Sequence, residues 1–346
     1  MTIRCSIRSL AGLVLQAALL ATVVGKAAAD PLTLTPTGIA DGFTLTTFAT
    51  VDPQNAGTFN LGPFGVAVAS NGNVIVGNNP GANDDFNSQG TRLVFADVDG
   101  QTLASALNAI TPGGVLHQAY ATAGGQAYGA VDRQLVEFNS DGTVNHVLTG
   151  VTTLMTLGMW GNPGNGHILA FSDGGLIDIN PLASGGAGSF RVVNSQVTGS
   201  ALTISADGTT VYAVTGSGIN SIDIATGAEG FVASLSNHPL GIGAILSSND
   251  LNGDLVVNGA AGEVDLVDPS TGTITVIATG GSRGGYVSPD PSNGTLFVDQ
   301  SVVIDRLGCA GCSIGPTVPE PSTWGLLACA LAVGLGLLPR GRKAVH

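Results

Sequence analysis

Turn dipeptides recur along this chain at a nearly constant interval, and this repeat constrains the fold more than any other feature. The first series is Asn71-Gly72, Gly124-Gly125, Asn165-Gly166, Asp207-Gly208, Asn252-Gly253 and Asn293-Gly294. A second series keeps step with it: Gly100, Gly142, Gly185, Gly227 and Gly272. Asn-Gly and Asp-Gly between apolar runs indicate β-hairpin turns, because both turn positions tolerate positive φ. Two turns in each repeat of about 40–45 residues predict the four-stranded unit of a β-propeller.

The apolar segments between these turns give the number of units. The fourth unit is the clearest, with strands in ALTISADG, TTVYAVTG, SGINSIDIATG and AEGFVASLS. The sixth has only three strands before Cys309. We expect residues 41–51, DGFTLTTFATV, to supply its outer strand and close the ring, which removes an open sheet edge. The sequence therefore predicts an all-β fold, a six-bladed β-propeller over residues 30–308, followed by a linker at 309–318.

Both ends of the chain carry export signals. Arg4 and Arg8 precede an apolar segment at 10–24, and the small residues 27–29 suit cleavage by signal peptidase. We therefore expect residues 1–29 to be a signal peptide, with Asp30 as the first residue of the mature protein. A membrane anchor formed by the same apolar segment is the alternative.

The C-terminal segment 319–346 combines three features in a fixed order. Pro319, Glu320 and Pro321 precede an uncharged apolar run at 324–338, and a basic cluster ends the chain. This segment resembles the PEP-CTERM sorting tail of exported bacterial proteins. The resemblance implies recognition of Pro319-Glu320-Pro321 by an exosortase-type membrane sortase, with transient anchoring of the apolar run as a transmembrane segment. A plain C-terminal anchor with a chance Pro-Glu-Pro is the alternative. The expected destination is the cell surface or the extracellular space, as in a biofilm matrix.

The body between these segments is acidic and contains no lysine. Residues 30–318 hold five arginines and 23 of the 24 acidic residues of a chain whose formal net charge is −13. Nucleic-acid binding requires basic contacts to phosphate, so this composition argues against a nucleic-acid partner. It suits an extracellular protein or one that collects divalent cations.

Only two cysteines, Cys309 and Cys312, lie in the body, and they are separated by two residues. In an oxidising compartment this pair is expected to form a small disulfide loop. One such pair supplies half of a zinc site, and Pro316 and Pro319 follow where a thioredoxin-like motif would have a helix.

The residue pattern of the repeats resembles that of the NHL and gluconolactonase type of propeller. The segments that carry the resemblance are GPFGVAVASNGNVIVGN at 62–78 and HPLGIGAILSSNDLNGDLVV at 238–257. A WD40 propeller fits less well, because the repeats lack Trp-Asp ends. The gluconolactonase resemblance implies one calcium ion at the axis, held by a Glu, Asn and Asp set. The first blade lacks the expected Glu, so the set is incomplete.

One face of the predicted ring gathers polar side chains near the ends of the second strands and in the loops that enter each blade. The candidate ligand face consists of His117, Asp132, Asp173, His238, Asn258 and Asp299, with Asn78 and Asn79 nearby. Asn and Asp also suit turns, which is the structural alternative. Blade 1 carries an insertion at 78–90, in which Asp84 and Asp85 are candidate calcium ligands. The insertion does not match an EF-hand, and a solvated acidic loop is its alternative.

The sequence is compatible with two classes of function. The first is an exported, non-catalytic surface or matrix protein that presents a propeller face to an exopolysaccharide or a surface protein. The second is a calcium-dependent lactonase or esterase-like hydrolase. We identify no catalytic residues, because the G-x-S-x-G, H-E-x-x-H and phosphate-loop motifs are all missing from the sequence.

Overall fold

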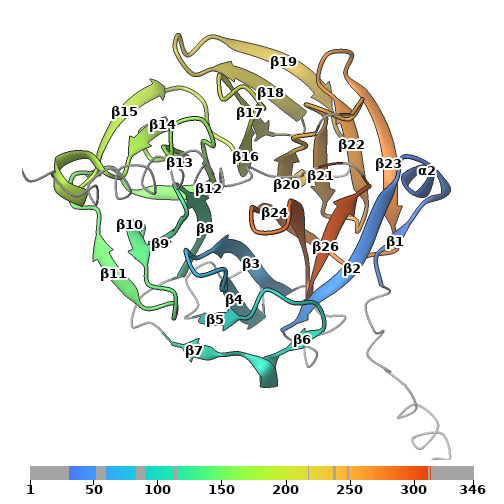
Figure 1. The fold of residues 1–346 in the computed structure, drawn as a ribbon. Helices are drawn as coiled ribbons and strands as arrows, with labels where there is room; N and C mark the ends of the chain where they lie inside the picture. The colour runs from blue at the N-terminus through green and yellow to red at the C-terminus, as the bar shows by residue number, and fades with distance from the viewer. Residues whose placement is uncertain are drawn as a thin grey trace, which may run out of the picture.

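The computed structural model describes residues 31–51, 60–82, 90–111, 116–216, 218–236, 239–247, 249–310 and residue 312. Across these ranges the strands form six sheets arranged radially around an axis (Figure 1). The predicted all-β, six-bladed propeller is thereby confirmed. The predicted signal peptide and sorting tail lie outside the described residues. Within the described ranges, no helix is long and apolar enough to cross a membrane.

The strands of each blade follow one another from the axis outward. Blade 1 contains β3 (Asn60–Val68), β4 (Val74–Ala82), β5 (Thr91–Phe95) and β7 (Asn108–Ile110). Blade 2 contains β8 (Leu116–Ala123), β9 (Gln126–Val131), β10 (Gln134–Phe138) and β11 (Val144–Val147). Blade 3 contains β12 (Met155–Gly161), β13 (Ile168–Ser172), β14 (Gly175–Asn180) and β15 (Ser189–Asn194). Blade 4 contains β16 (Ala201–Ile204), β17 (Thr210–Thr215), β18 (Gly218–Asp223) and β19 (Glu229–Ser234).

The last two blades each gain a strand from another part of the chain. Blade 5 contains β20 (Pro239–Ala244), β21 (Leu255–Gly259), β22 (Val264–Asp268), β23 (Thr273–Thr279) and, outermost, β1 (Thr33–Leu34). Blade 6 contains β24 (Gly284–Asp290), β25 (Thr295–Gln300), β26 (Val303–Cys309), β2 (Phe43–Thr50) and β6 (Gln101–Thr102). The short helices are α2 (Pro36–Ala40), η2 (Leu103–Ser105) and η3 (Ala183–Gly186).

The ring closes through the N-terminal strand, as the sequence predicted. β2 pairs antiparallel with β26 from Phe43↔Cys309 to Thr50↔Val303. Phe48 of β2 is fully buried, and its ring lies 4.8 Å from Phe297 and 6.1 Å from Phe95 of blade 1. The N-terminal strand thus completes blade 6 and also packs against blade 1, where the two ends of the ring meet.

Two further strand additions were not anticipated from the sequence. β1 pairs with β23 of blade 5, and β6, from the segment between β5 and β7, pairs in parallel with β2. Both additions cover the outer edge of a blade, which leaves fewer unpaired backbone groups at that edge. Between β1 and β2, Thr35 caps α2 by accepting a hydrogen bond from the backbone N–H of Gly38.

The two glycine series that predicted the repeat have the backbone conformation that the turns require. All eleven, Gly72, Gly100, Gly125, Gly142, Gly166, Gly185, Gly208, Gly227, Gly253, Gly272 and Gly294, have φ between 69° and 93°. This left-handed region is open to glycine at no steric cost. The repeat in the sequence is therefore a repeat of turn geometry.

The innermost strands β3, β8, β12, β16, β20 and β24 contact one another in order around the axis. Glycine permits the close approach of neighbouring blades at Gly161 and Gly62. A Cβ at Gly161 would lie 1.9 Å from the carbonyl oxygen of Thr122 in blade 2, and one at Gly62 would lie 1.9 Å from that of Ser301 in blade 6. Apolar side chains fill the spaces between the sheets, so each blade buries both of its faces.

Four of the five arginines of the body reach across a blade boundary. Arg92 donates to the carbonyl oxygen of Gly142 at 2.6 Å, Arg133 to that of Met155 at 3.1 Å, and Arg191 to that of Ile224 at 3.0 Å. Arg306 of blade 6 pairs with Asp97 and Asp99, which follow β5 of blade 1. The few cationic side chains therefore hold neighbouring blades together.

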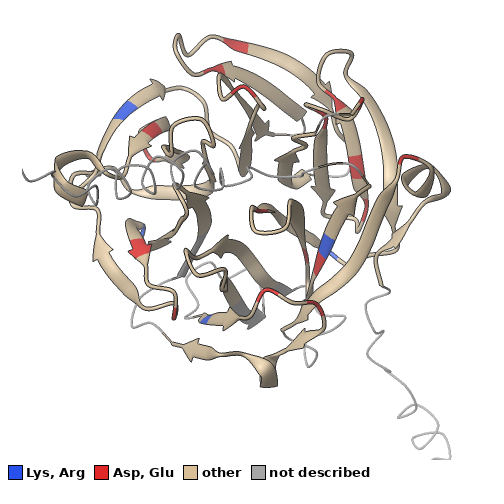
Figure 2. Ribbon diagram, viewed as in Figure 1, with Lys and Arg blue, Asp and Glu red and all other residues tan. Residues whose placement is uncertain are grey.

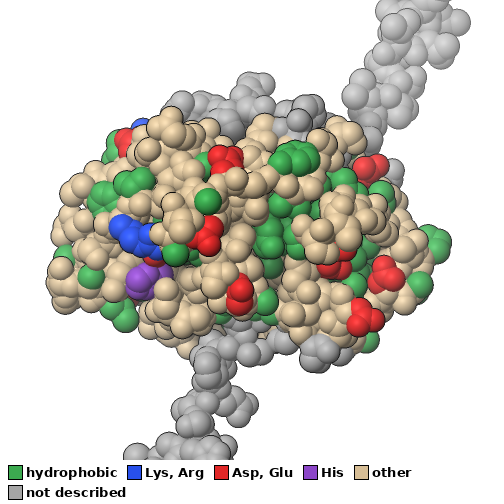
Figure 3. All heavy atoms as spheres, turned by 90° about the horizontal axis from the view of Figure 1, so that it is seen from above, with side chains coloured by type: hydrophobic (Ala, Val, Ile, Leu, Met, Phe, Trp, Pro, Cys, Tyr) green, Lys and Arg blue, Asp and Glu red, His purple; other side chains and the backbone are tan. Residues whose placement is uncertain are grey.

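The outer surface is correspondingly acidic. In the ribbon view the acidic residues outnumber the basic ones and are distributed around the ring (Figure 2). On the side drawn in space-filling form they are scattered among uncharged side chains (Figure 3). No described part of the chain thus suggests a phosphate-binding surface.

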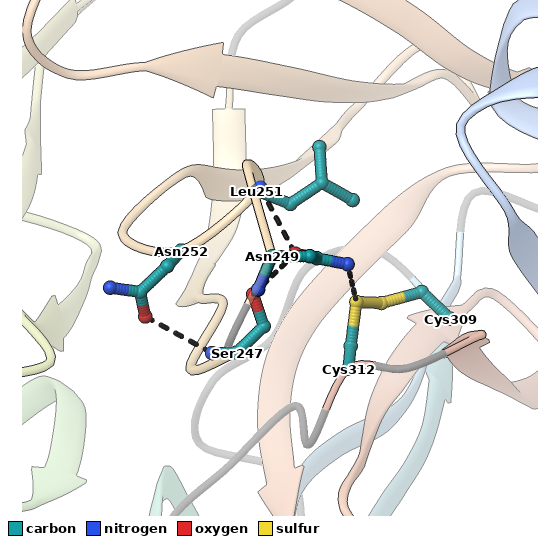
Figure 4. Close-up of a disulfide and its surroundings, with 6 residues drawn as sticks. All are labelled: Ser247, Asn249, Leu251, Asn252, Cys309 and Cys312. Atoms are coloured by element: carbon teal, nitrogen blue, oxygen red, sulfur yellow. Dashed lines mark hydrogen bonds between the residues drawn. A yellow bond between two sulfur atoms is a disulfide. The ribbon is translucent and has the colours of Figure 1, made fainter.

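The Cys309–Cys312 pair is joined by a disulfide, with the Cα atoms 5.2 Å apart. Cys309 is the last residue of β26, and Cys312 forms an antiparallel bridge with Ser247 of blade 5. Asn249 donates a hydrogen bond to Sγ of Cys312 at 3.4 Å (Figure 4). The small loop therefore fastens the end of blade 6 to the first turn of blade 5.

Candidate functional site

The structure separates the predicted ligand face into a buried pair and two exposed turn residues. Asn258 lies in β21 and is fully buried, and Asp299 lies in β25 with 1% of its surface exposed. Asp132 and Asp173 are exposed, in the turns that follow the second strands of blades 2 and 3. His117 belongs to β8, and its side chain is not among those described. His238, Asp84 and Asp85 lie outside the described residues.

Asn258 and Asp299 are in direct contact. The amide nitrogen of Asn258 donates to the backbone carbonyl of Asp299 at 2.7 Å and to that of Gly285 at 3.2 Å. Its amide oxygen accepts a hydrogen bond of 3.1 Å from Nε2 of Gln300. The side chain of Asn258 is therefore engaged in holding blade 5 to blade 6.

The carboxyl group of Asp299 is enclosed between blade 6 and blade 1. One oxygen, Oδ2, accepts a hydrogen bond of 3.1 Å from the backbone N–H of Gly65. The other, Oδ1, has no hydrogen-bond partner. Burial raises the pKa of Asp299 well above its usual range, and nearby Asp305 adds to the rise, while the Gly65 N–H opposes it. A buried acid in this state favours the protonated form.

A second buried oxygen without a partner lies in blade 1. Asn78 of β4 pairs with Pro63 of β3, and its Oδ1 is buried and accepts no hydrogen bond. Asn78 and Asp299 thus both contact the innermost strand β3. Such donors suit calcium, but calcium takes 6–8 oxygen ligands. Over the described ranges, no cluster of three or more His, Cys, Asp or Glu side chains could hold a metal ion.

Aromatic side chains occupy the central part of the ring. Phe64 of β3 and Tyr286 of β24 are in edge contact, with centroids 4.8 Å apart, and both are buried. The Tyr286 hydroxyl donates to the carbonyl oxygen of Ser200, at the start of blade 4, over 3.0 Å. Blade 6 thus reaches blade 4 through one side chain. Burial raises the pKa of Tyr286, so this hydroxyl stays a hydrogen-bond donor at neutral pH.

Asp173 makes its contacts within blade 3, with Thr153 and Leu154. Its carboxylate accepts hydrogen bonds from the Thr153 hydroxyl at 2.5 Å and from the backbone N–H of Leu154 at 3.1 Å. These hydrogen bonds lower the pKa of Asp173, and the bond from the Thr153 hydroxyl has the largest effect. They fix a turn of blade 3 to the segment that enters the same blade. These are contacts that stabilise a turn, as aspartate commonly does.

A buried charged cluster was missed by the sequence interpretation. Arg306 of β26 pairs with Asp97, with Asp99 at 3.1 Å and with Asp290 at 3.3 Å, and Asp290 is fully buried. Burial, together with nearby Asp97, raises the pKa of Asp290 to about 6, although Arg306 opposes the rise. These residues come from three separate segments, so no spacing in the sequence could have joined them.

Comparisons with known proteins identify the fold. The structure is similar to a gluconolactonase from Xanthomonas campestris, with a TM-score of 0.57 and 14% sequence identity, over 81% of this chain and 95% of the other. It is also similar to a Bacteroides thetaiotaomicron protein of unknown function, with a TM-score of 0.53 and 10% identity, over 78% and 76% of the two chains. No protein-family model matches the chain, and no curated protein matches it. At these identities the comparisons support a propeller of this type and no particular chemistry.

Proposed function

We propose that the chain is an exported, non-catalytic binding propeller, processed by signal peptidase at its N-terminus and by an exosortase-type sortase at Pro319-Glu320-Pro321. The observation that carries the binding role is the distribution of charged side chains between the blade boundaries and the outer surface. Four of the five body arginines bind across blade boundaries, and the body contains no lysine, so the charged groups of the outer surface are mainly carboxylates. Such a surface favours a neutral or basic partner at the cell surface, such as an uncharged exopolysaccharide or a basic protein patch.

The N-terminal contacts support the proposed cleavage before Asp30. Leu32 is 7% exposed and belongs to the hydrophobic core, and Thr33 pairs with Thr279 of blade 5. Packing of the body therefore starts two residues after the proposed new N-terminus. Removal of residues 1–29 leaves all of these contacts in place.

The binding role can be tested with the exported protein from its native host. We expect the labelled protein to bind cells or isolated matrix of that host, and binding to a basic partner to weaken as salt is raised. Binding no greater than that of an unrelated acidic propeller would contradict the proposal.

A calcium-dependent lactonase is the second candidate function, and the partnerless oxygens of Asn78 and Asp299 are the observation in its favour. A metal at this place would polarise a carbonyl group or activate a water molecule. Calorimetry with calcium, together with a lactone and ester hydrolysis screen, distinguishes the two functions. Turnover that disappears with a chelator and in Asp299→Asn would establish the enzyme and overturn the non-catalytic role.

A further inference from the structure

A partly enclosed cavity of about 170 Å³ lies between blades 5 and 6, and neither Asp299 nor Asn78 is among its lining residues. Its apolar walls come from Leu32 near the N-terminus, Leu45 of β2, and Val302 and Val303 around the start of β26. Its polar groups are the Gln300 amide, the Asp305 carboxyl group and the hydroxyls of Thr46, Thr47 and Ser282. At about 30 Å³ for each water-sized group, the cavity has room for about five of them.

The hydrogen-bond network fixes which end of the Gln300 amide lacks a partner. The Asn258 nitrogen donates to two backbone carbonyls, so the Asn258 oxygen must be the acceptor for Gln300. Gln300 therefore directs Nε2 at Asn258 and keeps Oε1 for another donor. Gln300 is 2% exposed, and its Oε1 has no partner. A buried acceptor without a donor is unfavourable, because it has given up its hydrogen bonds to water and received none in return.

Asp305 supplies a second acceptor and a charge. It is 4% exposed and accepts a hydrogen bond of 3.0 Å from the hydroxyl of Thr47. Burial raises its pKa to about 6, so the group carries a negative charge at neutral pH. Among the described residues, no arginine, lysine or histidine lines the cavity. The walls thus combine one amide, one carboxylate and three hydroxyl groups with aliphatic carbon.

We propose that this cavity binds a primary ammonium group carried on a short aliphatic chain. The ammonium has three N–H donors and a positive charge for Gln300 Oε1 and Asp305, and the alkyl part fits against Leu45 and Val303. A bare calcium ion fits less well, because it needs more oxygen ligands than one carboxylate and one amide provide. Binding of a free amine does not depend on the proposed function, whereas occupation by the chain's own N-terminus rests on the proposed cleavage before Asp30.

The ammonium group has two sources. One is a free small amine. The other is the chain itself, because cleavage before Asp30 places the α-amino group one residue from Pro31, which also lines the cavity. The body has no lysine, so an amine-acetylating reagent modifies only this α-amino group in the processed protein. Acetylation therefore separates the two sources.

The test uses the exported, processed protein, whose intact mass establishes its N-terminus, and measures binding of ethylammonium chloride by calorimetry at pH 7. Tetramethylammonium chloride is the control probe, because it keeps the charge and has no N–H donor. We expect saturable binding of ethylammonium alone. Asp305→Asn should weaken it at least tenfold, and Val303→Phe, which fills the cavity, should abolish it.

Asp290→Asn is the matched control variant, because it removes a buried carboxylate of the same blade outside this cavity, and it should change the affinity less than twofold. Binding that appears only after α-acetylation would support the ammonium site and assign it to the chain's own N-terminus. Ethylammonium binding that is no better than tetramethylammonium binding, before and after acetylation, would overturn the proposal. Binding that survives both Asp305→Asn and Val303→Phe would also overturn it.

Discussion

The side-chain amide of Asn258 donates a hydrogen bond of 2.7 Å to the backbone carbonyl of Asp299, across the boundary between blades 5 and 6. The sequence placed both residues on one face as candidate ligands. In the structure Asn258 uses both its nitrogen and its oxygen in protein contacts, whereas Asp299 keeps one oxygen without a partner. Asn258 therefore has a structural role, whereas the free oxygen of Asp299 can still accept a hydrogen bond or bind a ligand.

Stability should depend on pH in a direction opposite to that of ordinary acid denaturation. The pKa values of Asp254, Asp290 and Asp305 are raised from 3.8 to about 6, in each case mainly by burial. The folded state then binds more protons than the unfolded state between about pH 4 and 6. The stability from these groups is present below about pH 4 and is lost as the pH rises through about 6.

Exposed Asp268 acts in the opposite sense. Hydrogen bonds, first from the Ser270 hydroxyl, lower its pKa to about 2, so its contribution is lost as the pH falls below about 4. We therefore expect the melting temperature to be highest near pH 4–5 and to fall toward pH 7. Thermal melts at several pH values test this. Asp305→Asn should flatten the curve by on the order of 1 kcal/mol between pH 5 and 7, because part of the 1.36 kcal/mol per pKa unit is already lost between pH 4 and 5. A melting temperature that rises from pH 5 to 7 would contradict the prediction.

Closure of the ring should depend on Phe48. Its ring is fully buried between Phe297 and Phe95, so Phe48→Ala removes contacts to blades 6 and 1 together. We expect a loss of about 3–5 kcal/mol in the free energy of unfolding, measured by denaturant titration. Deletion of residues 30–51 should remove most of a marginal stability of roughly 5–15 kcal/mol. Phe231→Ala is the control, because Phe231 is 69% exposed on β19 and should change stability by less than about 0.5 kcal/mol.

The sequence predicted the fold better than the site, and the difference has a physical cause. Turn glycines such as Gly72 and Gly253 are local signals, because positive φ is a property of one residue. The contact of Asn258 with Asp299, and that of Arg306 with Asp97, join segments far apart in the chain. The added strands β1 and β6 have two residues each, too short for a periodic pattern.

The disulfide should add little to global stability and should fasten the end of blade 6. Cys309 and Cys312 close a very short loop, so we expect a gain below the usual range of about 2–4 kcal/mol. Replacing both with serine should lower protection from hydrogen exchange near Ser247, which pairs with Cys312. A thiol count on the denatured, non-reduced exported protein checks the bond itself. Two titratable thiols would rule it out.

The tail should be a processing signal. In the native host we expect the mature protein to lack residues 324–346, as measured by intact mass. Replacing Pro319, Glu320 and Pro321 with alanine should leave the full-length chain in the inner membrane, because the sortase would no longer recognise it. Mature protein that still carries residues 324–346 would count against processing. The corresponding control replaces Ser313, Gly315 and Thr317, which lie before the motif, and should be processed normally.

The ion pairs of Arg306 should make the closure of the ring sensitive to pH. Arg306→Gln leaves Asp97, Asp99 and Asp290 close together without their cation. Because breaking a buried pair exposes an uncompensated charge, we expect a loss of about 3–5 kcal/mol at pH 7, measured by denaturant titration. The loss should be smaller at pH 4.5, since Asp290, with its pKa raised to about 6, is then protonated.

Two comparisons isolate this effect. Arg191→Gln removes an arginine whose side chain is 49% exposed and which pairs with Asp178 at 2.9 Å, so its loss should be closer to 1 kcal/mol or less. Adding Asp290→Asn to Arg306→Gln should recover part of the stability at pH 7, because one of the three carboxylates is removed. The guanidinium carbon of Arg306 also lies 5.0 Å from the ring centroid of Phe48 and 5.2 Å from that of Phe297. If Arg306→Gln costs the same stability at both pH values, and Asp290→Asn does not change that cost, the prediction is wrong. Arg306 would then stabilise the junction through its packing over these rings rather than through its ion pairs.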